Sequence, residues 1–582
     1  METKPVDQDR IDIKKTKGAW KRLIKVFPKC HLPVVWLIAY IILSVGIINI
    51  GLDETEYTAQ LFAGDTSAAL VGKLIVIIII NLVGSGLLVY VRGLTSARID
   101  RNMRITLMDK ITRLPMSYFK DENPRDEIYR ISSNAIFVDS SIMLFLIPTA
   151  TCLYSMANVV SRVFKYDWRL TLVMLGLIPL NILVAFIFGR INFFLSKRDT
   201  QVNTRLTRKL AELITNIPLA KAFAKEEAET ERGKEHIDRL YRLNIKSSWL
   251  MQFRDVSEAI VHTLQTVAIC VVGLLLIGGG TITKRAWISF FLFSTVFSNS
   301  ITELMMYWQN IKTIQGGADP LCRVMEAKEE NYDGEPCEEL HGNLELSNVC
   351  FRYVEEKPVL KGLSCTFPDN SVTALLGMSG CGKTTLTHLI NRLYDPESGS
   401  ICVNGKNISD YALADYRKQF VVVSQNSMIF SGTVRENLNY GNSSQDEQRM
   451  YDALRLAGAY DFVMAMEGGL DAEIAEYGSN LSGGQKQRLA MARALMSDAH
   501  YLILDEPVAA MDAIATRELL DGLQNVVKDR CAIIISHTDA ILSLADRAVV
   551  VENGVLAAEG PIEEVAEKNA FLRTLMGKEA AV

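Results

Sequence analysis

Six runs of apolar residues constrain what this 582-residue chain can fold into more than any other feature. A helix needs about 20 apolar residues to cross the hydrocarbon part of a bilayer. The runs that meet this length lie at residues 32–52, 70–91, 141–163, 170–195, 257–280 and 286–308. Charged residues are sparse before about residue 310 and dense after it, so the chain is predicted to have a membrane half and a water-soluble half.

The charges beside the first run predict how it is oriented. Seven lysines and arginines lie between residues 14 and 29, whereas residues 53–69 carry four acids and no Lys or Arg. Basic residues favour the cytoplasmic side of a membrane, so we expect the N-terminus in the cytoplasm. The amphipathic stretch 18–27 is typical of a short helix lying at the membrane surface.

Two of the connections between the apolar runs are long. Residues 92–140 and 196–256 are charged and helical in pattern, and helix pairs of that length reach about 30–40 Å beyond a bilayer. Each is interrupted near its middle, at Leu114-Pro115 and at Asn216-Ile217-Pro218. We expect short helices at these tips that dock on another domain.

Composition excludes some partners. The 62 basic and 67 acidic residues give a net charge of −5, which argues against a nucleic-acid binder. The 10 cysteines form no Cys-x-x-Cys pair and do not combine with histidines at zinc-finger spacing, so no zinc site is expected from the linear sequence.

A glycine-rich loop follows the strand-like run 372–376. It fits Gly-x-x-x-x-Gly-Lys-Ser/Thr and includes Gly377, Ser379, Gly380, Cys381, Gly382, Lys383, Thr384 and Thr385. In such a loop the backbone N–H groups surround phosphate oxygens, the lysine reaches the β- and γ-phosphates, and the threonine holds Mg²⁺. The strand before it and the helix predicted after it make this a nucleotide-binding prediction.

Two further motifs complement this loop. The apolar run 501–504 ends in Asp505 and Glu506, which we expect to bind Mg²⁺ through water and to polarise an attacking water, respectively. The second motif is Ser482, Gly483, Gly484 and Gln485, directly before a helix-prone run. Exposed N–H groups and the helix dipole make such a terminus a second anion site.

Leu481–Gln485 and the motifs above are typical of one family. Through them the chain resembles the ATP-binding cassette (ABC) superfamily over nearly its whole length. The six spans, the long connections and a single C-terminal cassette look like an exporter-fold (type IV) half-transporter. The resemblance implies that two cassettes pack head to tail, with ATP between the glycine-rich loop of one and the Ser482 motif of the other. A second copy or a paralogous half-transporter is therefore an implied partner.

The resemblance also implies roles for single residues. Tyr353 matches the aromatic that stacks on adenine, Gln425 the glutamine that touches Mg²⁺, and His537 the histidine that contacts the γ-phosphate. Asp512 matches the aspartate of the D-loop, although Ala509-Ala510-Met511 replaces the usual Ser-Ala-Leu before it. The implied catalytic residues are Glu506, His537 and Gln425, and the implied Mg²⁺ ligands are Thr384, Gln425 and Asp505.

Cys381 stands where the family commonly has serine. A thiol at a helix N-terminus beside Lys383 is expected to be reactive. We therefore expect maleimide to block ATP hydrolysis and ATP to protect against it.

A cargo cavity is predicted from polar residues in the last two spans. Glu258 and His262 share a helical face with Asp255 and Gln265, and Asn299 and Glu303 share one in the last span. Ionisable groups at membrane depth usually face a cavity, which here would favour amphipathic or cationic cargo. The alternative is that Asp255 and Glu258 lie solvated at the cytoplasmic rim.

The predicted fold is an α-helical six-span membrane domain fused to an α/β P-loop NTPase domain. The expected segments are a cytoplasmic N-terminus (1–30), a transmembrane domain (31–315), a linker (316–342) and a cassette (343–582). The predicted function is ATP-driven export of amphipathic small molecules, lipids or peptides by alternating access of a dimer. The expected location is a bacterial inner membrane, with the cassette in the cytoplasm. Uptake of metal–siderophores and an ATP-gated channel or regulatory subunit are the alternatives.

Overall fold

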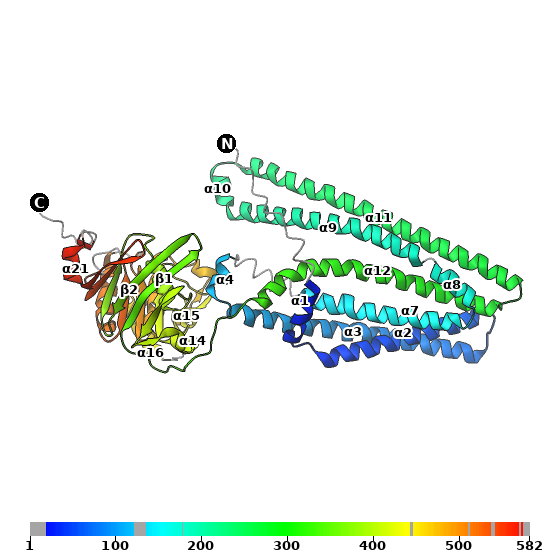
Figure 1. Cartoon of the computed structure of the whole chain (residues 1–582), viewed down its shortest axis with the longest axis horizontal. Helices are drawn as coiled ribbons and strands as arrows, with labels where there is room; N and C mark the ends of the chain where they lie inside the picture. Colours follow the sequence, from blue (N-terminus) through cyan, green and yellow to red (C-terminus); the bar gives the residue numbers. More distant parts are fainter. Residues whose placement is uncertain are drawn as a thin grey trace. The chain divides into compact units, whose positions relative to one another are not determined.

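The computed structural model describes residues 19–121, 136–176, 178–442, 446–509, 513–536, 542–569 and 572–573. They divide into two compact units (Figure 1). The helical unit comprises the described residues of Met1–Arg113 and Glu122–Ala327, and the α/β unit those of Leu114–Asp121 and Lys328–Val582.

The helical unit contains all six predicted spans. Among the described residues, six helical segments are long and apolar enough to cross a membrane: Val34–Phe62, Ala68–Thr112, Phe137–Phe164, Trp168–Phe188, Glu226–Gly278 and Lys284–Trp308. The elements that form this unit are α1 (Ala19–Val26), η2 (Phe27–Cys30), α2 (Val34–Phe62), α3 (Ala68–Thr112), α6 (Ile136–Ser140), η4 (Ser141–Leu146), α7 (Ile147–Phe164), α8 (Trp168–Gly176), α9 (Ile178–Thr215), α10 (Ile217–Ala222), α11 (Glu226–Gly278) and α12 (Lys284–Glu326).

Helix α2 continues ten residues beyond the predicted end of the first span, so three of the four acids that follow that span lie on a helix. Arg162 of α7 pairs with Asp53 at 2.7 Å and with Glu56 at 2.9 Å. The Nδ2 of Asn81 on α3 donates to Glu54 at 2.5 Å. Arg162 neutralises two of these carboxylates, and Asn81 donates a hydrogen bond to the third. Because the carboxylates have partners on neighbouring helices, the helix can extend past the predicted span.

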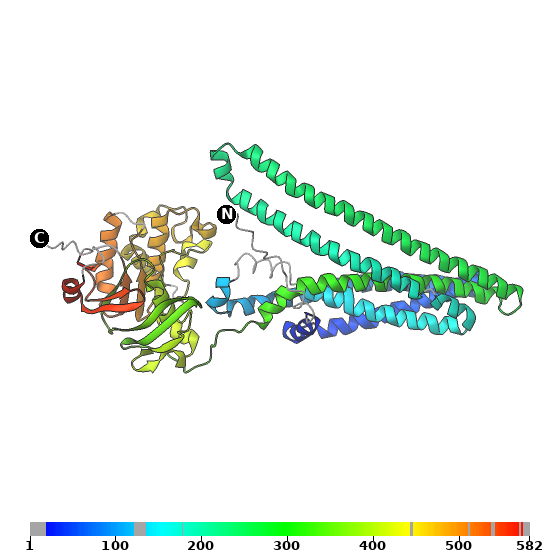
Figure 2. The ribbon, with the colours of Figure 1, turned by 45° about the horizontal axis from the view of Figure 1, so that its top comes forward.

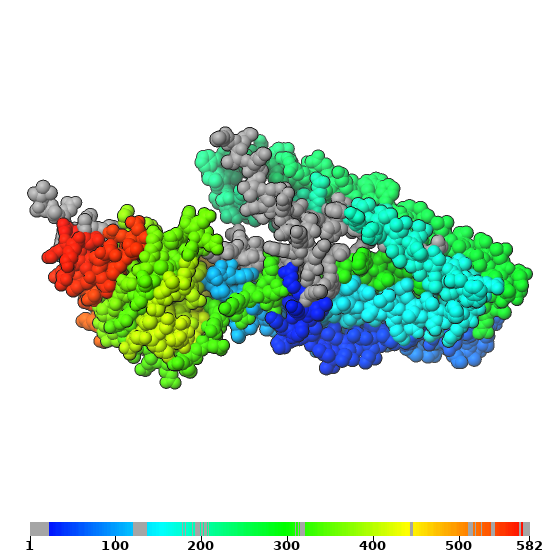
Figure 3. All heavy atoms as spheres, viewed as in Figure 1, coloured from blue at the N-terminus to red at the C-terminus, as the bar shows by residue number. Residues whose placement is uncertain are grey.

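The core of the helical unit is centred on α12. Phe290, Phe293 and Phe297 recur along one face of this helix and are fully buried. They pack with Val159 and Val163 of α7 in one apolar cluster. Helices α2 (blue) and α7 (cyan) lie side by side in Figures 1 and 3 and complete this part of the bundle.

Helices α9 and α11 form a long antiparallel hairpin closed by α10. The predicted break is confirmed, because α9 ends at Thr215 and α10 begins at Ile217 with Pro218 in its first turn. The end near α10 stands away from α12 (Figures 1 and 2). Apolar side chains there are exposed in the single chain: Ile214, Ile217, Leu219 and Phe223.

The α/β unit includes α4 (Met116–Asp121), the short helix at the tip of the first long connection. Its strands are β1 (Leu344–Val354), β2 (Lys357–Phe367), β3 (Val372–Leu376), β4 (Ser398–Val403), β5 (Lys406–Asn407), β6 (Phe420–Val423), β7 (Gly432–Thr433), β8 (Glu473–Ile474), β9 (Tyr501–Asp505), β10 (Cys531–Ile535), β11 (Arg547–Glu552) and β12 (Val555–Pro561). Its other helices are α13 (Lys383–Ile390), η5 (Ile408–Asp410), α14 (Leu413–Lys418), α15 (Val434–Leu438), α16 (Glu447–Leu456), α17 (Tyr460–Met464), η6 (Gly469–Asp471), η7 (Glu476–Gly478), α18 (Gly483–Leu495), α19 (Ala513–Val526) and α21 (Ile562–Lys568).

Two main sheets organise this unit. A six-stranded sheet has the order β12-β11-β3-β10-β9-β6, in which only β12 runs antiparallel to its neighbour. A four-stranded antiparallel sheet has the order β2-β1-β4-β5, and β7 pairs with β8 separately. The central strands β3, β9 and β10 are buried along their whole length, as parallel strands covered on both faces must be.

The predicted linker 316–342 differs from the structure. Helix α12 continues through its first part to Glu326, and the residues from Lys328 onward belong to the α/β unit. Glu330 makes a double hydrogen bond to Arg417 at 2.9 and 2.8 Å, and Glu335 bridges to Tyr411. Contacts with residues about 80 positions away, which local composition does not reveal, hold this segment.

Candidate nucleotide-binding site

The glycine-rich loop joins β3 to α13 as predicted, and space requires a glycine at position 377. Gly377, Gly380 and Gly382 all have positive φ angles, of 147°, 82° and 114°. A Cβ on Gly377 would lie 2.2 Å from the carbonyl oxygen of Val551, and one on Gly382 would lie 2.8 Å from Leu360. The loop therefore holds its backbone in a shape that residues with side chains adopt only under strain.

Lys383 and Thr384 begin α13 directly after this loop. The Nζ of Lys383 is buried and donates to the carbonyl oxygens of Gly377 at 2.7 Å and Met378 at 3.3 Å. The Oγ1 of Thr384 donates to Oδ2 of Asp505 at 3.4 Å. Two residues that are 121 positions apart in sequence are thus brought together, as the two motifs predict. Thr385 is buried in the same first turn, and Ser379 is exposed at the tip of the loop.

Topology explains why these motifs converge. In register, Ala374 pairs with Ile534, Ile535 with Asp505, and Leu504 with Val423. Strands β3, β10, β9 and β6 therefore end at one edge, where open parallel sheets bind their ligands. Gln425 follows β6 at this edge and is exposed.

Glu506 follows β9 in a strained conformation. Its φ is 52°, which is uncommon for a residue with a side chain. Its N–H donates to the carbonyl of Ile535 at 2.9 Å, and its carbonyl accepts from Nε2 of Gln487 at 2.7 Å. Gln487, a buried residue of α18 that the sequence analysis did not single out, thus helps to fix the turn that presents Glu506.

Tyr353 lies near the end of β1 in an aromatic cluster. Its ring packs edge to face against Phe351 and Tyr394, at centroid distances of 4.8 and 5.3 Å. Its hydroxyl lies 3.2 Å from Nδ1 of His388 on α13. Burial lowers the pKa of His388, so this imidazole is neutral near pH 7. The contact ties the predicted adenine-stacking residue to the helix that begins at Lys383. No sequence motif indicates His388.

The second glycine-rich helix start is closed by a side-chain cap. Ser482 caps α18: its Oγ accepts from the N–H of Gln485 at 3.3 Å, and Oε1 of Gln485 accepts from the N–H of Ser482 at 2.8 Å. Ser482 and Gly483 are exposed, and Gly484 is partly exposed. Two other predicted site residues, Asp512 and His537, lie outside the described residues.

The expectation of a reactive Cys381 needs correction. Its side chain is only 7% exposed and belongs to an apolar cluster with Leu375, Leu386 and Val551. A reagent reaches such a thiol poorly, since the loop directs this side chain towards the core. The backbone of Cys381 keeps its place in the loop, where its N–H donates to Met378 at 3.2 Å.

The predicted cargo residues share no hydrogen bond or ion pair among the contacts that the structure describes. Glu258 is partly buried and faces Arg254 at 3.8 Å, and Arg254 also pairs with Asp255 at 2.7 Å. His262, Asn299 and Glu303 are exposed in the single chain. Arg254, a residue that the motifs did not indicate, offsets the acidity expected in this middle part of α11. Among the described residues, a hydrogen bond from Ser298 to Oε1 of Gln265, at 3.4 Å, joins the two helices beside their apolar contacts.

Comparison with known proteins agrees with these features. A family profile described as ABC transporter matches residues 360–509, and one described as ABC transporter transmembrane region matches residues 35–301. The ATP-dependent lipid A-core flippase of Syntrophus aciditrophicus is 30% identical over 482 residues, which cover 80% of this chain and 78% of that protein. The flippase of the same name from Desulfotalea psychrophila is 29% identical and covers 82% and 85%, and that of Escherichia coli K12 is 28% identical and covers 81% and 82%.

A solved structure, of a bacterial Atm1-family ABC exporter with ATP bound, has the same fold. It matches 96% of this chain and 99% of its own at a TM-score of 0.83 and 19% identity. The chain therefore belongs to the ABC transporter family, as its motifs predicted. It is an ATPase coupled to transport across a membrane, built as an exporter-fold half-transporter.

Proposed function

We propose that two copies of this chain form an ATP-driven flippase or exporter of lipids or similar amphipathic molecules. The observation that carries the proposal is the contrast between the two phosphate-binding helix starts. At the start of α13, Lys383 is hydrogen-bonded to the glycine-rich loop and Thr384 to Asp505 of the same chain. At the start of α18, Ser482 and Gly483 are exposed. An exposed helix N-terminus can bind phosphates that are held by a second chain.

Exposed apolar residues support the same assembly. Ile214, Ile217, Leu219 and Phe223 gather around α10, at the tip of the second long connection. Apolar side chains at a position predicted to project into water call for a covering partner. We assign the cover to the second copy of the chain, because a half-transporter needs one to complete its pair of sites.

Magnesium fits the residues at the end of β9. Thr384 and Asp505 offer oxygen ligands 3.4 Å apart, and Gln425 offers an amide oxygen at the same sheet edge. Oxygen ligands are those that Mg²⁺ prefers. When bound there, the ion neutralises charge on the β- and γ-phosphates.

The side chains around this position take distinct roles. Lys383 attracts the phosphates, and Glu506, placed one residue beyond Asp505, orients and polarises the attacking water. Gln425 follows β6 at the same sheet edge, and the family resemblance assigns His537 to the γ-phosphate. Tyr353 supplies an aromatic face for adenine at the other end of the site.

The relatives favour lipid cargo. Three flippases whose names specify lipid A-core are 28–30% identical over about four fifths of this chain. They do not favour metal–siderophore uptake, and the glutamate at position 506 disfavours a channel or regulatory subunit. By the charge pattern before residue 30, the N-terminus and the α/β unit lie in the cytoplasm of a bacterial cell, and the six spans lie in its inner membrane.

The test is transport by the purified chain alone in liposomes. A lipid with a fluorescent headgroup is reconstituted with wild-type protein or with the Glu506→Gln variant, and Mg-ATP is added outside. The proposal expects a dithionite-resistant fraction to change with ATP for the wild type only, and ATPase activity to be stimulated by the same lipid. No lipid movement together with ATP-driven movement of a water-soluble peptide or siderophore would overturn it.

A further inference from the structure

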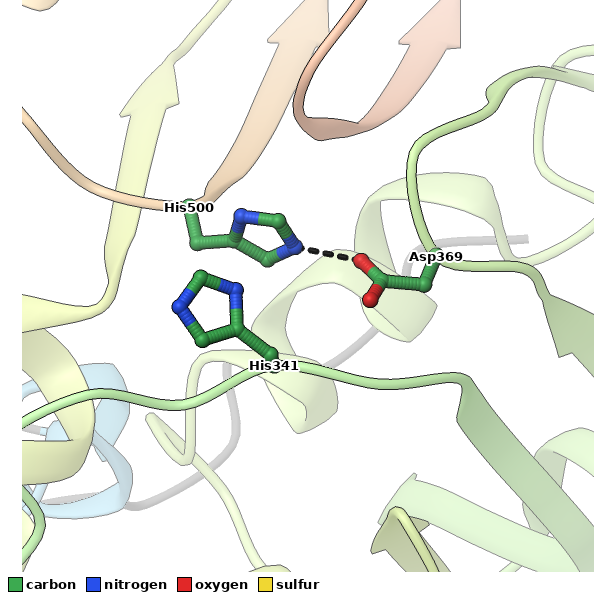
Figure 4. Close-up of side chains that lie close together, drawn as sticks. All are labelled: His341, Asp369 and His500. Atoms are coloured by element: carbon green, nitrogen blue, oxygen red, sulfur yellow. Dashed lines mark hydrogen bonds and ion pairs between the residues drawn. The ribbon is translucent and has the colours of Figure 1, made fainter.

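Three metal-ligating side chains meet at the edge of the α/β unit opposite to the nucleotide site. His341 lies just before β1, Asp369 lies in the turn between β2 and β3, and His500 lies directly before β9 (Figure 4). One ligand atom from each of the three lies within 4.8 Å of the other two. Residues separated by up to 159 positions converge here, which is why linear spacing could not indicate the cluster.

The backbone around the cluster is well fixed. The carbonyl of His500 accepts from the N–H of Cys531 at 3.1 Å, because β9 and β10 pair at this point. The N–H of Asp369 donates to Oδ1 of Asn343 at 2.9 Å, and Oδ1 of Asp369 accepts from the N–H of Asn370 at 3.0 Å. Two of the three ligands are thus held by elements that pack in the core.

The side chains face one another. Nε2 of His500 pairs with Oδ1 of Asp369, and the ring of His341 stands edge to face on that of His500 at a centroid distance of 4.3 Å (Figure 4). The exposed side-chain fractions are 9% for His500, 26% for Asp369 and 59% for His341. The cluster therefore has a buried floor and one side open to solvent, which gives an ion an entry path.

We propose that His341, Asp369 and His500 form a binding site for a transition-metal ion of the Zn²⁺ class. Two imidazole nitrogens and a carboxylate oxygen are the donors that such ions prefer, whereas Mg²⁺ and Ca²⁺ favour oxygen alone. Three protein ligands leave a fourth position of a tetrahedral ion for water. Glu339, whose Oε2 lies 3.8 Å from Nε2 of His341, is a nearby acid that can orient that ring.

An ion would change the spacing of the three ligand atoms. Atoms about 2.0–2.1 Å from a tetrahedral ion lie about 3.3–3.5 Å apart, so the widest separation in the cluster must shorten by up to about 1.5 Å, and the contact between His500 and Asp369 must open to admit the ion. His341 is the most exposed of the three and can move. A hydrogen-bonded pair that served structure alone would need only His500 and Asp369, whereas the second imidazole is the feature that makes a three-ligand set.

The position of the site separates it from ATP chemistry. His500 precedes the first residue of β9, and the predicted Mg²⁺ ligand Asp505 is the last, so about 15 Å of strand lies between them. A bound ion would join the segment before β1, the β2–β3 turn and the start of β9. Because binding to the folded state adds stability, the ion should raise the melting temperature of this unit.

The test is Zn²⁺ binding to the full-length purified chain, carrying no histidine tag, in buffer with excess Mg²⁺. Equilibrium dialysis is compared for wild type, His341→Gln and Asp369→Asn, with His236→Gln on α11 as a control outside the cluster. We expect one tight equivalent per chain in the wild type and the control. Either cluster variant should bind at least about tenfold more weakly, since loss of even a supporting residue costs about 10- to 100-fold.

A Co²⁺ absorption spectrum and a melting curve check the Zn²⁺-binding result independently. Cobalt should give visible bands typical of nitrogen and oxygen ligands, and the metal-dependent rise in melting temperature should vanish in His341→Gln. That variant changes an exposed side chain, so its melting temperature without metal should match that of the wild type. Equal Zn²⁺ affinity in all four proteins, no saturable binding, or a cobalt–thiolate band from the cysteines would each overturn the proposal.

Discussion

The starts of α13 and α18 are both glycine-rich helix N-termini, yet they sit in different surroundings. At α13, Gly377 lies against Val551 and Gly382 against Leu360, and Lys383 is buried with its ammonium group bonded to the loop. At α18, Gly483 is exposed and Gly484 partly exposed, and the helix is closed by a reciprocal cap between Ser482 and Gln485. The first start is a finished binding loop. The second is a stable helix end whose ligand must come from elsewhere.

The difference shows that a shared sequence pattern does not make two sites equivalent. Burial decides whether a phosphate site is complete in one chain, and the pattern alone does not report burial. Variants at the two starts should therefore separate nucleotide binding from hydrolysis.

The largest effect is expected for Glu506→Gln. The amide keeps the size of the side chain but cannot polarise water as a carboxylate does, so hydrolysis should fall about 10²- to 10⁴-fold. ATP affinity, measured by equilibrium binding, should stay near the wild-type value. Loss of binding together with hydrolysis would show that the residue serves the fold instead.

Lys383→Ala should weaken binding and hydrolysis together. Its ammonium group is a buried cation at the start of α13, and removing a charged group aimed at phosphate costs about 10²- to 10³-fold in rate. Binding of a fluorescent ATP analogue and release of phosphate should both fall. Intact binding would place the phosphates away from this helix start.

Ser482→Asp should separate the two activities. Aspartate caps a helix as well as serine does, so α18 should keep its stability, but its charge repels a phosphate. We expect hydrolysis to fall about 100-fold while each chain still binds nucleotide at the α13 loop. Ser497→Asp, a change in the turn after the other end of α18, is the control and should hydrolyse ATP normally.

Two glycines of the α13 loop should differ in their tolerance of a methyl group. Gly377→Ala places a Cβ 2.2 Å from a backbone oxygen, whereas Gly380 has nothing within 4 Å. We expect Gly377→Ala to cost at least about 3 kcal/mol and Gly380→Ala about 1–2 kcal/mol of stability, the latter from its φ of 82° alone. Chemical denaturation measures both, and equal losses would contradict the difference in packing.

The smallest effect is expected at Cys381. Because its thiol is buried, maleimide should modify it more slowly than it modifies Cys350 or Cys402, which are partly exposed. Peptide mass spectrometry after timed labelling gives the order. Fastest labelling at Cys381 would restore the expectation that sequence alone suggested.

Much of this architecture could be predicted from the sequence, because long apolar runs and short phosphate motifs depend on local order. The six spans and the approach of Thr384 to Asp505 are confirmed. The extension of α2 could not be foreseen, since it depends on Arg162 about 100 residues away. The same holds for the segment 328–342, which is fixed by Arg417 and Tyr411.

The parts of the site that sequence missed also depend on distant partners. Gln487 reaches the carbonyl of Glu506, and His388 reaches Tyr353, through packing that no spacing rule describes. Cys381 was misjudged because the motif fixes its backbone and says nothing of the direction of its side chain. The proximity of His341, Asp369 and His500 depends on the order of the strands in the sheet, which residue spacing does not reveal.

The most direct measurement asks whether the α13 loop of one chain meets the α18 start of another across ATP. Glu506→Gln chains carrying either Ser379→Cys or Ser482→Cys are mixed in liposomes, oxidised with and without Mg-ATP, and separated by size. The account predicts a cross-linked dimer that forms in the mixture, depends on ATP and exceeds the background of each single variant. No ATP-dependent cross-link in the mixture, or one no stronger than that of either variant alone, would contradict it.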